Sequence, residues 1–195
     1  MNPILNQNLF LVKEHVGMFK AANNYDIYNP ESNEIVMNCR ENNLGFFTKM
    51  LRFTDYKTMT PFNIEITTVS GEKIISVKRG IAWFRSTVAV FDEKDRLLGT
   101  FKQKIFSIGG KFEILDKNEK SVATLQGKWT GWEFKFSHEN KQLAQVTKKW
   151  AGMGKELFTS ADNYVLQIEE TVAPDSPLRQ LILAAVMCID MVLKE

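Results

Sequence analysis

The stretch LRQLILAAVMCIDMVLKE, residues 178–195, decides the fold of this chain. Its positions 181–189 form an unbroken run of nine apolar residues, and the Leu, Ala and Met in this run favour a helix over a strand. Ser176 can cap the first turn of that helix, and Pro177 suits its first position. A helix that is apolar on all sides is enclosed either by lipid or by the rest of its own protein. The remaining sequence indicates which of the two encloses it.

The composition is that of a soluble globular protein. Hydrophobic residues make up 44% of the 195 residues and charged residues 25%, and both are ordinary values for such proteins. No Pro-rich or Ser-rich linker divides the chain, which predicts a single domain over residues 1–195. Cys39 and Cys188 lie among apolar residues and are expected to be reduced and buried. No secretory signal is visible at the N-terminus, so we expect a cytoplasmic protein.

Positive charge is concentrated in the middle of the chain. The formal net charge is only +2, but residues 70–155 hold seventeen basic and nine acidic side chains, and residues 156–195 hold two basic and seven acidic ones. Such a basic region can attract phosphate-bearing partners, either lipid head groups or nucleic acid. It is equally consistent with a soluble sheet that turns its lysines toward water. The sequence does not show whether these charges share one side of the molecule, so both interpretations stay open.

Short strands separated by polar turns recur from residue 25 onward. The turns carry the Asp, Asn, Gly or Ser residues that tight reversals need. Within residues 132–136, three aromatic side chains share one face and two charged side chains the other, as in an antiparallel strand with one dry side. The predicted strand pairs are 25–28 with 35–37, 62–66 with 74–77, 87–91 with 97–101, 112–115 with 122–125, and 132–136 with 143–146.

About a dozen short antiparallel strands favour a closed barrel, because closure removes the exposed edges of the sheet. A strand at 164–168 completes the series, and a short helix at 43–53 interrupts it. A barrel of this size has an interior wider than its own side chains can fill. The C-terminal helix, about 27 Å long, suits that interior. We therefore predict a mainly β fold, a closed antiparallel barrel of about twelve strands around a buried hydrophobic C-terminal helix.

The same helix is a poor candidate for a membrane span. A transmembrane helix needs about 20 predominantly apolar residues, and Arg179, Gln180 and Asp190 limit the continuous run to nine. Asp190 either meets an Arg or Lys that lines the barrel or marks the point where the helix emerges from it, and we expect the second. The residues expected in the core of the barrel are Leu181, Leu183, Val186 and Ile189.

An ordered set of short motifs is similar to a known family. The motifs are NYDIY at residues 24–28, PFNI at 61–64, KKWAG at 148–152, ELFT at 156–159 and ADNY at 161–164, followed by the apolar helix that ends in CID at 188–190. With them the chain resembles the phospholipid scramblase family, within the wider group that shares the tubby-like fold and includes the plant LURP-one-related proteins. The resemblance covers nearly the whole chain. It implies a closed twelve-stranded barrel around a buried C-terminal helix, in agreement with the prediction above.

The function that the resemblance implies concerns phospholipids. Scramblase relatives are associated with calcium-stimulated, energy-independent movement of phospholipids between leaflets, and the resemblance implies carboxylates at the first, third and twelfth positions of a calcium segment. Here these positions hold Ser160, Asp162 and Thr171, so one carboxylate of three is present. Calcium needs six to eight oxygen ligands, and the nearby Glu169 and Glu170 are expected to point to opposite faces of a strand. We therefore expect no tight calcium site around Asp162, no other metal site and no cofactor.

Basic side chains are the candidates for contact with anionic head groups. Without a lipid anchor, stable attachment to a membrane needs a basic patch or the insertion of apolar residues. A solvated lysine face is the alternative for all of these side chains. The candidates are Lys102, Lys104, Lys111, Lys128, Lys148 and Lys149.

No catalytic constellation is visible in the sequence. His15 lies in the N-terminal segment and His138 in a polar turn, where we expect it to be exposed. Arg40 can lower the pKa of the adjacent Cys39, but the sequence places no histidine as a base for that thiol. No cluster of Cys and His has zinc spacing. We therefore expect a protein that is not an enzyme.

Three hypotheses for the function follow. The leading one is a non-catalytic, scramblase-like protein that interacts with phospholipids at a membrane surface and is cytoplasmic or peripherally attached. The alternative is a soluble scaffold or regulatory module that binds protein or nucleic acid through a basic face. Salt-dependent retention on nucleic acid, lost on replacement of Lys148 and Lys149, would favour that alternative. The third, an integral scramblase that uses the last helix as its span, conflicts with the polar residues in that helix.

Overall fold

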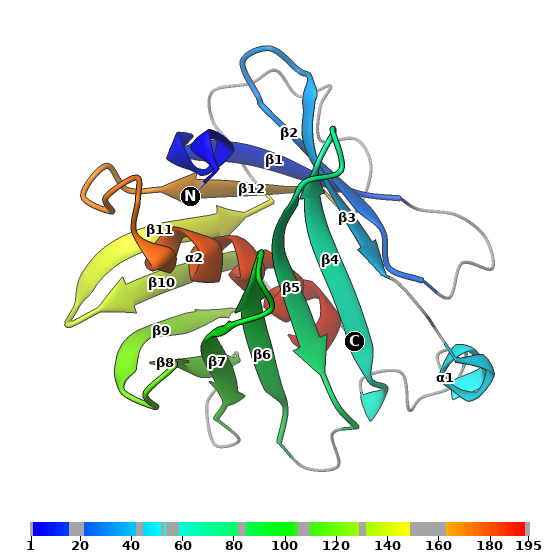
Figure 1. Ribbon diagram of the computed structural model, residues 1–195. Helices are drawn as coiled ribbons and strands as arrows, with labels where there is room; N and C mark the ends of the chain where they lie inside the picture. Colours follow the sequence, from blue (N-terminus) through cyan, green and yellow to red (C-terminus); the bar gives the residue numbers. More distant parts are fainter. Residues whose placement is uncertain are drawn as a thin grey trace.

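Twelve antiparallel strands form a closed barrel around a central helix in the computed structural model (Figure 1). The structure describes residues 2–15, 22–41, 45–51, 53, 59–81, 85–104, 110–128, 132–148 and 163–193. Each strand pairs with its neighbours in sequence, and the last pairs with the first, which confirms the predicted closed barrel. The strands are β1 (Leu9–Glu14), β2 (Tyr25–Tyr28), β3 (Ile35–Glu41), β4 (Phe62–Thr68), β5 (Lys73–Arg79), β6 (Thr87–Asp92), β7 (Leu97–Gln103), β8 (Lys111–Asp116), β9 (Ser121–Lys128), β10 (Glu133–His138), β11 (Lys141–Thr147) and β12 (Asn163–Ile168).

Strand β1 is missing from the prediction, which began the strands at residue 25. It pairs with both β2 and β12 and so closes the barrel. Its residues Phe10, Leu11 and Val12 are all buried, although successive side chains of a strand point to opposite faces. A strand that is buried on both faces shows a continuous apolar run instead of an alternating pattern. This short run, followed by Lys13 and Glu14, gave no strand signal.

Helix α2 (Pro177–Cys188) lies inside the barrel and continues as a π-helical turn, η5 (Ile189–Leu193). The Ser176 side chain accepts a hydrogen bond from the backbone N–H of Leu178, which confirms the predicted cap. No helix in the described part of the chain is both long enough and apolar enough to span a membrane. All four residues expected in the core are buried, namely Leu181, Leu183, Val186 and Ile189.

The polar residues at the start of α2 are buried as well. Arg179 and Gln180 are polar residues in a helix that is otherwise mostly apolar, yet they are only 2% and 4% exposed. Gln180 donates from Nε2 to the carbonyl oxygen of Ile74 at 3.2 Å. Arg179 donates to backbone carbonyls of the N-terminal segment, including that of Leu5 at 2.9 Å. These hydrogen bonds make burial of the two polar side chains possible.

The barrel has two ends that are built differently. At one end, here called the hairpin end, turns join β2 to β3, β4 to β5, β6 to β7, β8 to β9 and β10 to β11, and α2 begins there. At the other, here called the α1 end, the strands β1, β3, β5, β7, β9 and β11 end, and α2 ends there as well. The short helix α1 (Phe46–Leu51) confirms the helix expected within residues 43–53, and it stands away from the barrel wall (Figure 1).

Candidate functional site

Four of the six candidate lysines lie near one another on the outer surface of adjacent strands. Lys102 is in β7, Lys111 begins β8 and Lys128 ends β9, while Lys104 directly follows β7. The residues that alternate with them along these strands point into the core, so the lysines face outward. The ends of β7 and β9 and the start of β8 lie at the α1 end, so Lys104, Lys111 and Lys128 sit at its rim.

Neighbouring carboxylates neutralise part of this positive charge. Lys104 Nζ lies 2.5 Å from Glu113 Oε2, and Lys102 Nζ lies 3.9 Å from an oxygen of Glu119. The hydrogen bond from Lys104 lowers the pKa of Glu113 below its usual value. Among the residues that the structure describes, Lys111 and Lys128 have no ion-pair partner. The surface is therefore a mixed one, in which Lys111 and Lys128 are not paired with any described carboxylate.

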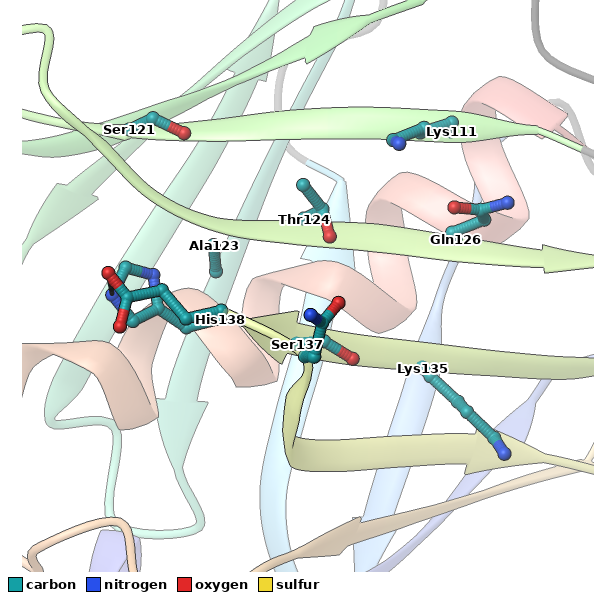
Figure 2. Close-up of a pocket in the computed structure, with 10 residues that line it drawn as sticks. Lys111, Ser121, Ala123, Thr124, Gln126, Lys135, Ser137 and His138 are labelled. Carbon is teal, nitrogen blue, oxygen red and sulfur yellow. Dashed lines mark ion pairs between the residues drawn. The ribbon is translucent and has the colours of Figure 1, made fainter.

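A polar hollow lies on the outer surface of β8, β9 and β10 (Figure 2). Its volume is about 670 Å³. The register shifts between Ile114 and Leu115 in β8 and between Phe136 and Ser137 in β10, close to this hollow. Such irregularities bend and twist a sheet locally, which makes room for a concave outer face. The side chains that line it are Lys111, Ser121, Ala123, Thr124, Gln126, Lys135, Ser137, His138, Glu139 and Asn140.

Two lysines flank the hollow on either side of a glutamine. Lys111 in β8 is directly opposite Gln126 in β9, and Gln126 is directly opposite Lys135 in β10. Strands lie about 4.8 Å apart, so the backbones of the two lysines are about 10 Å apart. Figure 2 shows the two lysines on opposite sides of Gln126. Lys135 Nζ also lies 3.3 Å from Glu133 Oε1. Lys135 could not be recognised as a candidate from the sequence, because only the strand register places it beside Gln126.

The polar side chains around the hollow mainly offer hydrogen-bond donors. Ser121, Thr124 and Ser137 offer hydroxyl groups, and the exposed His138 lies 3.8 Å from a carboxylate oxygen of Glu139. Exposure of His138 confirms the expectation from its turn. Ammonium and hydroxyl groups together suit a phosphate-bearing ligand, because phosphate oxygens accept several hydrogen bonds and carry negative charge.

A buried polar cluster lies at the α1 end of the barrel interior. Asp190, in the π-helical turn, accepts hydrogen bonds from the hydroxyl groups of Tyr25 in β2 and Tyr164 in β12. Asp190 is only 5% exposed, so the expectation that the helix emerges there is wrong. Burial and the nearby charge of Asp190 raise the pKa of Tyr25 well above its usual value. The two tyrosines supply the hydrogen bonds without which burial of a carboxyl group in the apolar interior of the barrel would be unfavourable.

Lys148 lies at the rim of this cluster rather than with the other candidate lysines. Its Nζ is 3.6 Å from the centroid of the Trp132 ring and 5.3 Å from that of Tyr164. A cation over aromatic faces is stabilised by the negative potential of the rings. Lys149 lies outside the described residues.

The residues considered for calcium do not lie together on a strand. Glu169 and Glu170 were expected on opposite faces of a strand, but both follow the end of β12, in the connection to α2. Glu169 accepts a hydrogen bond from Gln142 Nε2 at 2.9 Å. Within the described part of the chain, no group of three or more His, Cys, Asp or Glu side chains is placed to hold a metal ion. Ser160 and Asp162 lie outside it, so the expectation for calcium stays a prediction.

The structure brings together one histidine–carboxylate pair that the sequence did not reveal. His15 Nε2 lies 2.5 Å from Asp26 Oδ2, and Arg40 Nη2 lies 2.6 Å from the other oxygen of Asp26. The nearby Cys39 is fully buried, and burial raises the pKa of its thiol despite the adjacent Arg40. A buried, protonated thiol is a poor nucleophile. The contacts of Asp26 with Arg40 and His15 therefore join β2 to β3 and to the segment just after β1.

Comparison with known proteins gives consistent results. Residues 4–195 match the family model described as Scramblase. A phospholipid scramblase family protein from Schizosaccharomyces pombe is 23% identical over 193 residues, and the match covers 91% of this chain but 50% of that protein, so the chain spans about half the length of this relative. An X-ray structure of an Arabidopsis thaliana protein has a TM-score of 0.55 and 14% identity, with 97% of this chain and 95% of that one covered. At this identity, the structural likeness shows a shared fold alone.

Proposed function

Because the chain belongs to the Scramblase family, we propose that it binds anionic phospholipids at a membrane surface through the outer face of β7 to β10. The observation that carries this proposal is the pair Lys111 and Lys135, which flank Gln126 beside a hollow lined by hydroxyl groups. The phosphate group of a lipid head group matches these donors in charge and hydrogen bonding. The proposed role is non-catalytic: the face binds a head group, the contact from which any movement of phospholipid between leaflets would start.

Each lysine contributes little to the free energy of binding, and the contributions of several lysines add up. A lysine near an anionic membrane contributes about 1 kcal/mol, and salt screens the attraction. We expect Lys111 and Lys128 to contribute most, because neither is paired with a described carboxylate. Lys102 and Lys104 contribute less, because Glu119 and Glu113 partly neutralise them. The proposed attachment is therefore peripheral, reversible and sensitive to salt, on the cytoplasmic side of a membrane.

Co-sedimentation with vesicles tests this proposal. The protein is mixed with phosphatidylcholine vesicles that contain either no anionic lipid or phosphatidylserine, at low and at high salt. We expect binding only with the anionic lipid, and weaker binding at high salt. Lys111→Glu and Lys128→Glu should each lower the binding constant roughly tenfold, because each reverses one charge at the surface. Lys135→Glu should lower it less, because Glu133 already neutralises part of the charge of Lys135. Lys94→Glu, at the exposed turn between β6 and β7, is the matched control and should bind like the unmodified protein.

The outcomes separate this proposal from its alternative. Absence of binding to anionic vesicles at low ionic strength would contradict it, and so would an equal loss of binding in Lys94→Glu. Retention on nucleic acid without binding to vesicles would instead support a scaffold or regulatory module with a basic face.

A further inference from the structure

The described connections at the two ends of the barrel carry opposite net charge. In the described connections at the α1 end, four side chains are basic and none is acidic. The connections at the hairpin end contain ten acidic and four basic side chains. The basic residues at the α1 end are Lys49, Arg85, Lys104 and Lys148. The acidic residues at the hairpin end are Glu31, Glu34, Glu72, Glu93, Asp95, Glu119, Glu139, Glu169, Glu170 and Asp175, and the basic ones are Lys94, Arg96, Lys117 and Lys120.

Large apolar side chains are exposed at the basic end. Met50 in α1 is 55% exposed, Phe53 just after it is 63% exposed, and Ile81, in the connection after β5, is 67% exposed. At the hairpin end, Val69 is 63% exposed, and Ile35 and Leu97, the first residues of β3 and β7, are each 37% exposed. Helix α1 stands away from the barrel (Figure 1), so its exposed Met50 is not part of the barrel core. Exposed apolar side chains beside basic ones are typical of surfaces that insert into the interface of an anionic bilayer.

From this polarity we infer that the barrel docks end-on, with its α1 end in the interface of an anionic bilayer and its hairpin end pointing away. The inference rests on the proposed membrane binding, narrows the contact to the α1 end of that face, where Lys111 and Lys128 lie, and adds the inserted residues. An apolar patch alone would also suit a protein partner. The separation of charge favours a bilayer, because an anionic surface attracts the basic end and repels the acidic end of the same molecule.

End-on docking also accounts for the position of the unpaired lysines. Lys111 is the first residue of β8 and Lys128 is the last of β9, so both lie at the rim of the α1 end. Apolar groups that bind to an interface enter about 5–10 Å below the head groups. With Phe53 and Ile81 inserted, the lysines at the same end of the barrel face the head groups. The apolar residues and the lysines then bind the same membrane at the same time.

Fluorescent probes on single cysteines measure this orientation directly. Cys39 and Cys188 are fully buried, so an environment-sensitive label attaches to a cysteine introduced at the surface. The variants are Phe53→Cys and Ile81→Cys at the α1 end, Val69→Cys at the hairpin end and Gln126→Cys on the outer face. With phosphatidylserine vesicles that contain a nitroxide-labelled lipid, we expect the probes at positions 53 and 81 to shift to shorter wavelength and be quenched. The probe at position 69 should not change.

The possible results distinguish the orientation from the proposed function. If the protein binds vesicles but only the probe at position 126 is quenched, the barrel docks on its side, and the end-on inference is wrong while membrane binding stands. Equal quenching at positions 53 and 69 also overturns the inference. If no labelled variant and no unlabelled protein binds anionic vesicles, both proposals fail.

A second experiment removes exposed apolar side chains and measures vesicle binding without a label. The double variant Phe53→Ser with Ile81→Ser should bind anionic vesicles at least about tenfold more weakly, because both side chains lose their burial in the bilayer. Val69→Ser is the control with similar exposure and should bind normally. All three positions are exposed, so the midpoint of thermal unfolding should stay unchanged, which separates lost binding from lost folding. Unchanged binding of the double variant would refute insertion.

Discussion

Single residues inside the barrel show how a polar group can be kept in an apolar core. Asp190 lies among apolar side chains of the barrel, and the hydroxyl groups of Tyr25 and Tyr164 donate to its two carboxylate oxygens. The three residues come from β2, β12 and the end of the central helix, so this cluster links the helix to the two strands that flank β1. A buried polar group without a partner costs more free energy than the hydrogen bond itself contributes.

Replacement of Asp190 tests this cluster. Asp190→Ala leaves two buried hydroxyl groups without their acceptor, and we expect the free energy of unfolding to fall by about 2–4 kcal/mol. Asp190→Asn keeps one acceptor oxygen and should lose less. Urea unfolding of both variants measures the difference. A loss below about 0.5 kcal/mol in Asp190→Ala would show that the tyrosines find other partners at no cost.

Asp26 gives a prediction for the dependence of stability on pH. Burial raises the pKa of Asp26, but hydrogen bonds from Arg40 and His15 more than offset this and leave it below 3.8. A carboxyl group with a lowered pKa in the folded state stabilises the protein above its unfolded pKa, and this contribution is lost as the pH falls through the folded value. Asp26→Asn should therefore be less stable than the unmodified protein at neutral pH. On acidification below about pH 4, it should lose less stability than the unmodified protein does. Urea unfolding between pH 6 and pH 2 measures this, and parallel curves for both proteins would contradict it.

At the scale of one element, Arg179 makes most of the side-chain hydrogen bonds described at the start of α2. The guanidinium of Arg179 donates all its N–H groups to oxygens of two other segments, and burial lowers its pKa. These oxygens come from the segment before β1 and the connection after β12, so Arg179 ties both to the helix. The acceptors are the carbonyl groups of Leu5, Gln7, Val172 and Ala173 and the side chain of Asn8.

Replacement of Arg179 should therefore destabilise the segment before β1 and the connection after β12 as well as the helix. Arg179→Ala leaves several buried carbonyl groups without donors, and we expect a loss of about 3 kcal/mol or more. Arg179→Lys should be intermediate, because one ammonium group cannot match the planar fork of five donors. Hydrogen exchange should also become faster in the backbone of residues 3–14. Ser176→Ala is the control within the same turn and should cost about 1 kcal/mol without loosening that segment.

At the scale of the whole molecule, we expect the barrel and its helix to unfold together. The core comprises inward side chains of the strands together with nearly every side chain of α2. A barrel of twelve strands cannot fill its interior without such an insert. We expect a chain that ends at Ser176 to lose cooperative unfolding and to bind a hydrophobic dye, whereas a chain that ends at Leu193 should unfold like the complete protein. Calorimetry measures both, and a cooperative transition at the normal temperature in the shorter chain would contradict this picture.

The sequence predicted the fold better than the candidate site. Turn residues and alternating strands are local signals, so eleven strands, α1, the capped helix and its core residues could all be recognised. Lys102, Lys104, Lys111 and Lys128 could be named as outward lysines for the same reason. Their partners could not be recognised, because Glu113 and Glu119 reach them only through the pairing of β7 with β8 and the turn that follows.

Taken alone, the sequence determined that a helix apolar on all sides must be enclosed and that short alternating strands would enclose it. Both follow from patterns within a few neighbouring residues. Only the tertiary structure decided which distant polar groups meet. Tyr25 and Asp190 are 165 positions apart and lie in hydrogen-bond contact because the barrel closes around its helix. The antiparallel order of the strands places alternate connections at opposite ends, so the described connections are mainly acidic at one end and basic at the other.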